Sequence, residues 1–172
     1  TPLFYYSVNT SGADGGIMVT GSHVPPQFNG FKIVSKNSAP IFSESGLPQI
    51  KELANQDLGN SSKKGIIKKN DLVGEYMDFL INKSGFDDET SRKKIENLNL
   101  VIDASNGVGS LVLEPLFKKL NFNYTPLYFE IDGSFPNHLS DTSREENVKD
   151  LRAEVLKQKS DLGMAFDGDA DR

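Results

Sequence analysis

The stretch that decides the fold opens with LNLVID at residues 98–103 and closes with LGMAFD at residues 162–167. Between these two apolar runs lie a helical pattern, a third apolar run at residues 124–130 and a second helical pattern at residues 145–157. This β-α-β-α-β alternation predicts parallel strands joined by right-handed crossovers, with functional loops at the carboxyl ends of the strands. Pro115 is expected to kink or restart the first of the two helices.

The pattern before residue 83 is different. The turn-rich sequence there predicts short helices and strands, at residues 3–8 (helix), 15–20 (strand), 31–34 (strand), 47–56 (helix) and after a cap at Asn70 or Asp71 (helix). Within the second of these, the run at residues 16–19 is short and apolar throughout, which predicts a strand buried on both faces. A polar segment at residues 83–97 is the best candidate for a domain boundary. We therefore expect an α/β protein of two mixed α/β layer domains, a partial first domain at residues 1–85 and a second at residues 86–172.

Composition limits the classes of function. The 172 residues include 19 basic and 24 acidic side chains, and the net charge of −5 argues against a broad nucleic-acid surface. No stretch approaches the roughly 18 apolar residues of a membrane span, and the lack of cysteine excludes disulfides and thiolate metal sites. We expect a cytoplasmic protein without a membrane or nucleic-acid partner. Because the chain starts at Thr1 rather than Met and stops at Arg172, directly after a functional-looking loop, we also expect it to be a piece of a longer multidomain chain.

The closing hexapeptide, Asp167-Gly168-Asp169-Ala170-Asp171-Arg172, is the most informative in the sequence. Three carboxylates at alternate positions after a strand can converge on one divalent cation, and without a cation they would repel one another. Hard oxygen ligands favour magnesium or calcium, and magnesium usually completes such a shell with water and a phosphate oxygen. Arg172 adds an anion-binding guanidinium beside this site.

Two other interpretations of the hexapeptide remain open. Alternating acids also begin the calcium loop of an EF-hand module, although Arg172 stands where that loop needs glycine. A haloacid-dehalogenase-like phosphatase also has an apolar strand that ends in Asp-x-Asp. In such an enzyme Asp167 would be the nucleophile and Asp169 the acid/base.

A second candidate loop, at residues 20–30, is rich in glycine and proline and contains Ser22 and His23. A serine hydroxyl can carry a phosphoryl group if a base accepts its proton and cations neutralise the phosphate. His23 or Lys32 could be that base, and the acidic hexapeptide could supply the cation.

These two motifs together identify a resemblance. TGSHVPPQFNGFK at residues 20–32, followed by DGDADR at residues 167–172, resembles the α-D-phosphohexomutases. With DGSFPNH at residues 132–138, the chain is most similar to the bacterial phosphomannomutase/phosphoglucomutase branch. The chain has Val24 where the family usually has asparagine. It also has LSDT at residues 139–142 where the family's loop continues with another histidine and an Asp-Pro step.

The resemblance implies a phosphoenzyme that interconverts hexose 1-phosphate and hexose 6-phosphate through a hexose bisphosphate. Ser22 would carry the phosphoryl group and, with Asp167, Asp169 and Asp171, would hold Mg²⁺. Lys32 would be the general acid/base, His23 would assist at the phosphoserine, and Arg172 would bind anionic oxygen. The resemblance also places further domains after Arg172, so we expect the 172 residues alone to lack mutase activity. His138 and an anion-binding nest at residues 106–109 are further candidates without an assigned role.

Overall fold

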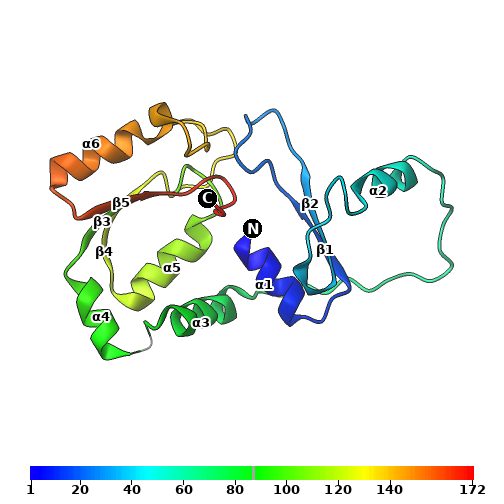
Figure 1. The fold of residues 1–172 in the computed structure, drawn as a ribbon, viewed down its shortest axis with the longest axis horizontal. Helices are drawn as coiled ribbons and strands as arrows, with labels where there is room; N and C mark the ends of the chain where they lie inside the picture. The colour runs from blue at the N-terminus through cyan, green and yellow to red at the C-terminus, as the bar shows by residue number, and fades with distance from the viewer. Residues whose placement is uncertain (87) are drawn as a thin grey trace.

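A three-stranded parallel sheet forms the second half of the molecule (Figure 1). The structure is a computed structural model that describes residues 1–86 and 88–172; Asp87, within the predicted boundary segment, lies outside the described residues. Strand β3 (Asn99–Asp103) lies between β4 (Asn123–Leu127) and β5 (Leu162–Ala165) and pairs with both in parallel. The predicted β-α-β-α-β unit is therefore confirmed.

Helices cover both faces of this sheet. On one face, α5 (Ser110–Leu120) buries Leu113 and Phe117 against Leu100 and Ile102 of β3. On the other face lies α6 (Lys149–Gln158), which follows a 3₁₀ turn, η2 (Glu145–Val148), and contacts β3 and β5. Helix α5 continues through Pro115, so of the two expected effects the restart is wrong and the kink stays a prediction. Proline removes only one backbone hydrogen bond, and residues on both sides of it pack on the sheet.

The first half of the chain is built on an antiparallel hairpin of β1 (Gly15–Val19) and β2 (Phe31–Ser35). Helix α1 (Pro2–Thr10) packs closely on one face of β1, where an added Cβ at Gly16 would lie 2.6 Å from Val8. On the other face Ile17 is 66% and Val19 62% exposed. The predicted burial of this strand on both faces is wrong for this chain, because β1 belongs to a hairpin with helix cover on one side only. A 3₁₀ turn, η1 (Lys36–Ser38), and α2 (Leu47–Ala54) follow β2.

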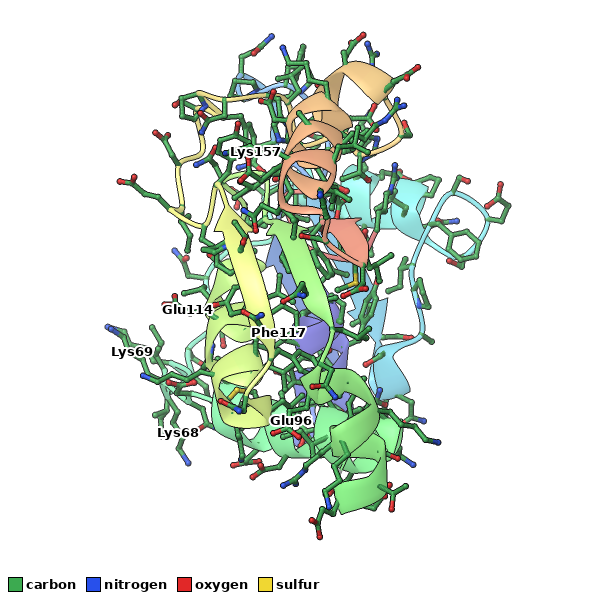
Figure 2. The ribbon with its side chains drawn as sticks, turned by 90° about the vertical axis from the view of Figure 1, so that its left-hand side faces the viewer. Lys68, Lys69, Glu96, Glu114, Phe117 and Lys157 are labelled. Carbon is green, nitrogen blue, oxygen red and sulfur yellow. The ribbon has the colours of Figure 1, made fainter. Side chains whose placement is uncertain are left out.

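Two further helices lead to the parallel sheet. Helix α3 (Val73–Ser84) contacts both α1 and α5, and its Tyr76 and Phe79 pack against Tyr6. Its N-cap is Leu72, and Asp71 accepts a hydrogen bond from the backbone N–H of Val73 instead. Helix α4 (Glu89–Glu96) begins at the side-chain cap Asp88. Before α3, Lys68 and Lys69 extend outward from the body of the molecule (Figure 2).

In the described part of the chain, the helices are too short or too polar to cross a membrane.

The sheet determines where the loops meet. All three parallel strands point the same way, so the loops that follow them lie at one edge (Figure 1). The loop after β5 carries the acidic hexapeptide, and both termini lie near it (Figure 1). Residues 20–30, which connect the two strands of the hairpin, lie at the same edge. The contact between the Ser22 hydroxyl and Asp167 of the hexapeptide shows this placement.

Candidate functional site

The three aspartates of residues 167–172, here called the acidic loop, converge. One carboxylate oxygen from each of Asp167, Asp169 and Asp171 lies within 4.8 Å of the others. Asp167 and Asp169 are almost completely buried, whereas Asp171 is exposed. The loop folds back on Asp167, whose Oδ1 accepts the backbone N–H groups of Asp171 (3.0 Å) and Arg172 (3.1 Å). These two bonds close the loop and keep residues 171 and 172 beside Asp167.

Residues 20–30, here called the Ser22 loop, bring the candidate nucleophile to this point. The Ser22 Oγ lies 3.4 Å from Asp167 Oδ2 and 3.1 Å from His23 Nδ1. Ser22 has a positive φ of 51°, and its backbone N–H is bonded to Thr20 Oγ1 at 2.8 Å. Thr20 in turn donates from Oγ1 to Asp169 Oδ2 at 3.0 Å. Thr20 therefore connects the two loops, a role that sequence reasoning missed although Thr20 directly precedes Gly21 and Ser22.

Lys32 projects from β2 into the acidic loop. Its ammonium group lies 2.7 Å from Asp169 Oδ2 and 2.5 Å from Asp171 Oδ2. Partial burial opposes the charged form, but the two carboxylates prevail and raise the pKa of Lys32. Lys32 is therefore held in its charged ammonium form, between two carboxylates. Arg172 lies farther out, with its Nε 4.0 Å from Asp167 Oδ2 and its side chain half-exposed.

The electrostatics of the acidic loop fit a cation. Burial raises the pKa of Asp167, and the charges of Asp169 and Asp171 act in the same direction. Burial acts the same way on Asp169, but hydrogen bonds from Lys32 and from Thr1 lower its pKa to about 2. Asp169 Oδ1 is buried and has no hydrogen-bond partner among the described residues. A buried carboxylate oxygen without a partner, within a cluster of hard oxygen donors, suits a divalent cation such as magnesium.

The loop after β3 packs against the acidic loop and is hydrogen-bonded to it. The N–H of Val108 bonds to Gly168 O at 3.0 Å, and the hydroxyl of Ser105 bonds to Phe166 O at 2.7 Å. Gly107 packs so closely that an added Cβ would lie 2.6 Å from Gly168 O. The N–H groups of Asn106, Gly107 and Val108 are all bonded to backbone carbonyls. Residues 106–109 therefore form a structural support, and those three N–H groups are not free to bind an anion.

His138 has a defined partner that the sequence did not reveal. Its Nε2 lies 3.0 Å from Asp103 Oδ2, its Nδ1 lies 2.9 Å from Leu139 O, and its side chain is only 6% exposed. The ring also packs edge-on against Tyr128, whose hydroxyl bonds to Asp150. Burial and this bond raise the pKa of Tyr128 to about 12. His138 thus anchors residues 132–141 to the carboxyl end of β3.

The pair of His138 and Asp103 predicts that the stability of the fold depends on pH. The hydrogen bond to Asp103 raises the pKa of His138 above 6.5, although burial opposes this shift. The pair should therefore stabilise the fold fully below pH about 6.5, the value in an unfolded chain. This contribution should be lost as the pH rises through the folded pKa. Titrating the His138 ring by NMR should give a midpoint above 6.5.

His138→Gln is the matched variant for that measurement. It should remove the part of the pH dependence of the unfolding midpoint that lies above pH 6.5. A His138 midpoint at or below 6.5, or the same pH dependence in the variant, would contradict the expected pairing.

Sequence models of one protein family match both halves of the chain. The model described as phosphoglucomutase/phosphomannomutase α/β/α domain I matches residues 1–59, and that of α/β/α domain II matches residues 74–172. The domain boundary expected after residue 85 remains a prediction. The chain is 38% identical to the phosphomannomutase/phosphoglucomutase of Pseudomonas aeruginosa and 34% identical to the phosphoglucomutase of Neisseria gonorrhoeae. All of this chain aligns in both comparisons, with 35% of each relative.

A solved structure agrees with these sequence matches. The crystal structure of a phosphoglucomutase/phosphomannomutase family protein from Burkholderia thailandensis superposes with a TM-score of 0.79 at 30% identity. The match covers 99% of this chain and 37% of that protein. The chain thus spans about a third of the length of these relatives. Because the two domain models match most of the chain, in the order in which the domains follow one another, it belongs to the phosphoglucomutase/phosphomannomutase family.

Proposed function

We propose that the whole protein is a phosphohexomutase that interconverts hexose 1-phosphate and hexose 6-phosphate, with Ser22 as the phosphoryl carrier. Family membership supports this reaction class. The observation that carries the assignment to Ser22 is the position of its hydroxyl, 3.1 Å from His23 Nδ1 and 3.4 Å from Asp167 Oδ2. These contacts bring the proposed nucleophile next to the proposed base and the proposed cation site, an arrangement that suits phosphoryl transfer.

The proposed step exchanges one P–O bond for another. The bond between phosphorus and Ser22 Oγ breaks while a bond forms to the free hydroxyl of a hexose monophosphate, giving a hexose bisphosphate. His23, within reach of the hydroxyl, would return a proton to Ser22 Oγ. The sugar hydroxyl would lose its proton to Lys32. In the second half of the cycle Ser22 recovers a phosphoryl group from the other position of the sugar, and the proton movements reverse.

Lys32 must change its protonation state to act in both directions. Its bonds to Asp169 and Asp171 hold it as the ammonium form. If those carboxylates took another cationic partner, the pKa of Lys32 would fall, which would make it available as a base. Arg172, at the rim of the acidic loop, is placed to bind an anionic oxygen of the substrate.

We infer that Mg²⁺ is the metal of this site. Asp167, Asp169, Asp171 and an oxygen of the phosphorylated Ser22 would hold it, and the unpartnered Asp169 Oδ1 supports the fit. Bound there, the ion would neutralise the charge of the transferring phosphoryl group.

The two rival interpretations of the acidic loop make different demands. In a haloacid-dehalogenase-like phosphatase Asp167 would be phosphorylated. Its Oδ1, however, is engaged by two backbone N–H groups and Ser22 faces its Oδ2. A calcium-binding EF-hand needs a helix before the loop, where this chain has β5 (Leu162–Ala165). The geometry favours the mutase over both.

Mapping the phosphate on the purified whole protein tests the proposal. Mass spectrometry should find phosphate on Ser22 after incubation with a hexose bisphosphate, and the modification should survive hydroxylamine. An aspartyl phosphate at Asp167 would be cleaved by hydroxylamine and would support the phosphatase instead. A protein that binds calcium but carries phosphate at neither residue would support the calcium module. Either of the last two outcomes rejects the mutase proposal.

A further inference from the structure

The backbone carbonyl of Ser22 is held by a second serine, Ser140, from the loop after β4. The Ser140 hydroxyl donates to Ser22 O at 3.2 Å, across 118 residues of sequence. Ser140 is 1% exposed, so its hydroxyl cannot exchange this bond for one to bulk water. The bond therefore joins the parallel-sheet half of the molecule to the loop of the candidate nucleophile.

Ser140 is itself rigidly placed. Two residues earlier, His138 is bonded to the buried Asp103 at the end of β3. Asn137 donates to the side chain of Asn106 at 2.8 Å, and the carbonyl of Asp141 accepts from the Asn147 side chain at 2.8 Å. Contacts on both sides of Ser140 thus fix the position from which its hydroxyl reaches Ser22.

The space around Ser22 O is tightly filled. An added Cβ at Gly168 would lie 2.4 Å from Ser22 O and 3.2 Å from Ser140 Oγ. Only a glycine lets the acidic loop, the Ser22 loop and residues 132–141 approach this closely. The Ser22 backbone is also in the left-handed region, which is unfavourable for a residue with a side chain and has to be held by its surroundings.

We propose that Ser140 is a positioning residue for phosphoryl transfer: its bond to Ser22 O holds the left-handed backbone that directs Ser22 Oγ at Asp167. This inference rests on the proposed mutase function. Thr20 accepts a hydrogen bond from the backbone N–H of Ser22, and Ser140 donates one to its backbone carbonyl. Both backbone polar groups of Ser22 are therefore hydrogen-bonded to side chains. Ser140 touches no reacting atom. It also lies within the segment in which the chain departs from the family pattern, so the bond is expected to be specific to chains with a hydroxyl at this position.

The test compares Ser140→Ala with Ser143→Ala in the whole protein. Ser143 lies in the same loop, but its hydroxyl bonds to Asp141 Oδ1 at 2.6 Å. Leaving Ser22 O buried without its partner should lower kcat by roughly 5- to 100-fold. KM for the hexose phosphate should stay within about twofold, because no substrate contact is lost. Ser143→Ala should match the wild type in both constants.

A second measurement does not depend on catalysis. Amide hydrogen exchange over residues 20–24 should be at least about fivefold faster in Ser140→Ala than in the wild type, and unchanged in Ser143→Ala. Unchanged exchange in Ser140→Ala overturns the proposal, as does a kcat within twofold of wild type in an active protein. The proposal is also overturned if the fall in kcat of Ser140→Ala comes together with a lowered unfolding midpoint and a raised KM, because that combination marks a merely structural residue.

The two proposals fail separately. If the wild-type protein carries no phosphate on Ser22, the mutase proposal fails, and with it the catalytic role of Ser140. The exchange measurement then still decides whether Ser140 holds the Ser22 backbone.

Discussion

Replacing Ser22 with alanine is expected to abolish mutase turnover of the whole protein, with a fall in kcat on the order of 10⁴-fold or more. In the proposed cycle every phosphoryl group passes through Ser22 Oγ, so no alternative carrier remains once this oxygen is removed. The change is small structurally. The backbone bonds of Ser22 to Thr20 Oγ1 and from Ser140 Oγ do not involve the deleted hydroxyl.

A matched control separates loss of the carrier from loss of the fold. Ser61→Ala removes a hydroxyl from an exposed loop and should leave kcat unchanged. Ser22→Ala should keep the wild-type unfolding midpoint within a few degrees and should take up no phosphate from a hexose bisphosphate. Conversion of hexose 1-phosphate to hexose 6-phosphate at more than a few per cent of the wild-type rate would reject Ser22 as the carrier.

The parallel sheet could be predicted because its signal is local. Residues 98–103 and 162–167 are short apolar runs separated by helical patterns, and that alternation specifies both the strands and the edge at which their loops meet. The convergence of the three aspartates followed from the same reasoning, since they lie at alternate positions directly after β5. Burial of β1 was predicted wrongly, because an apolar run does not reveal how many layers cover it.

The contacts between loops could not be predicted in the same way. The bond from Ser140 to Ser22 and the pair of His138 and Asp103 join residues 118 and 35 positions apart. Both contacts depend on how the loops pack together in the fold. No local sequence pattern around a serine or a histidine predicts which distant residue it will contact. The close approach at Gly168 is of the same kind. A glycine in an acidic loop suggests a turn, whereas its position against Ser22 O emerges only from the fold.

Asp167→Asn is the second substitution for which we expect a large effect. Whether it stabilises or destabilises the protein should depend on the presence of magnesium. Asp167 is fully buried, and its Oδ1 accepts two backbone N–H groups that asparagine can also satisfy through its own carbonyl oxygen. The substitution removes one of three crowded negative charges, and the pKa of Asp167 is already raised by burial and by its acidic neighbours. Without magnesium, the variant should therefore be at least as stable as the wild type.

With magnesium, the order should reverse. A ligand that binds only the folded state at 100 times its dissociation constant adds about 2.7 kcal/mol to the free energy of unfolding. The wild type should gain this stability and Asp167→Asn should not, because a neutral amide oxygen is a poorer ligand than a carboxylate. Thermal unfolding of the whole protein across a Mg²⁺ titration measures both effects, with Asp14→Asn as the control for losing an exposed carboxylate. An equal magnesium-dependent shift in all three proteins would place the cation elsewhere, whereas a destabilised Asp167→Asn without magnesium would mean that Asp167 is needed chiefly as an anion for Arg172 and Ser22.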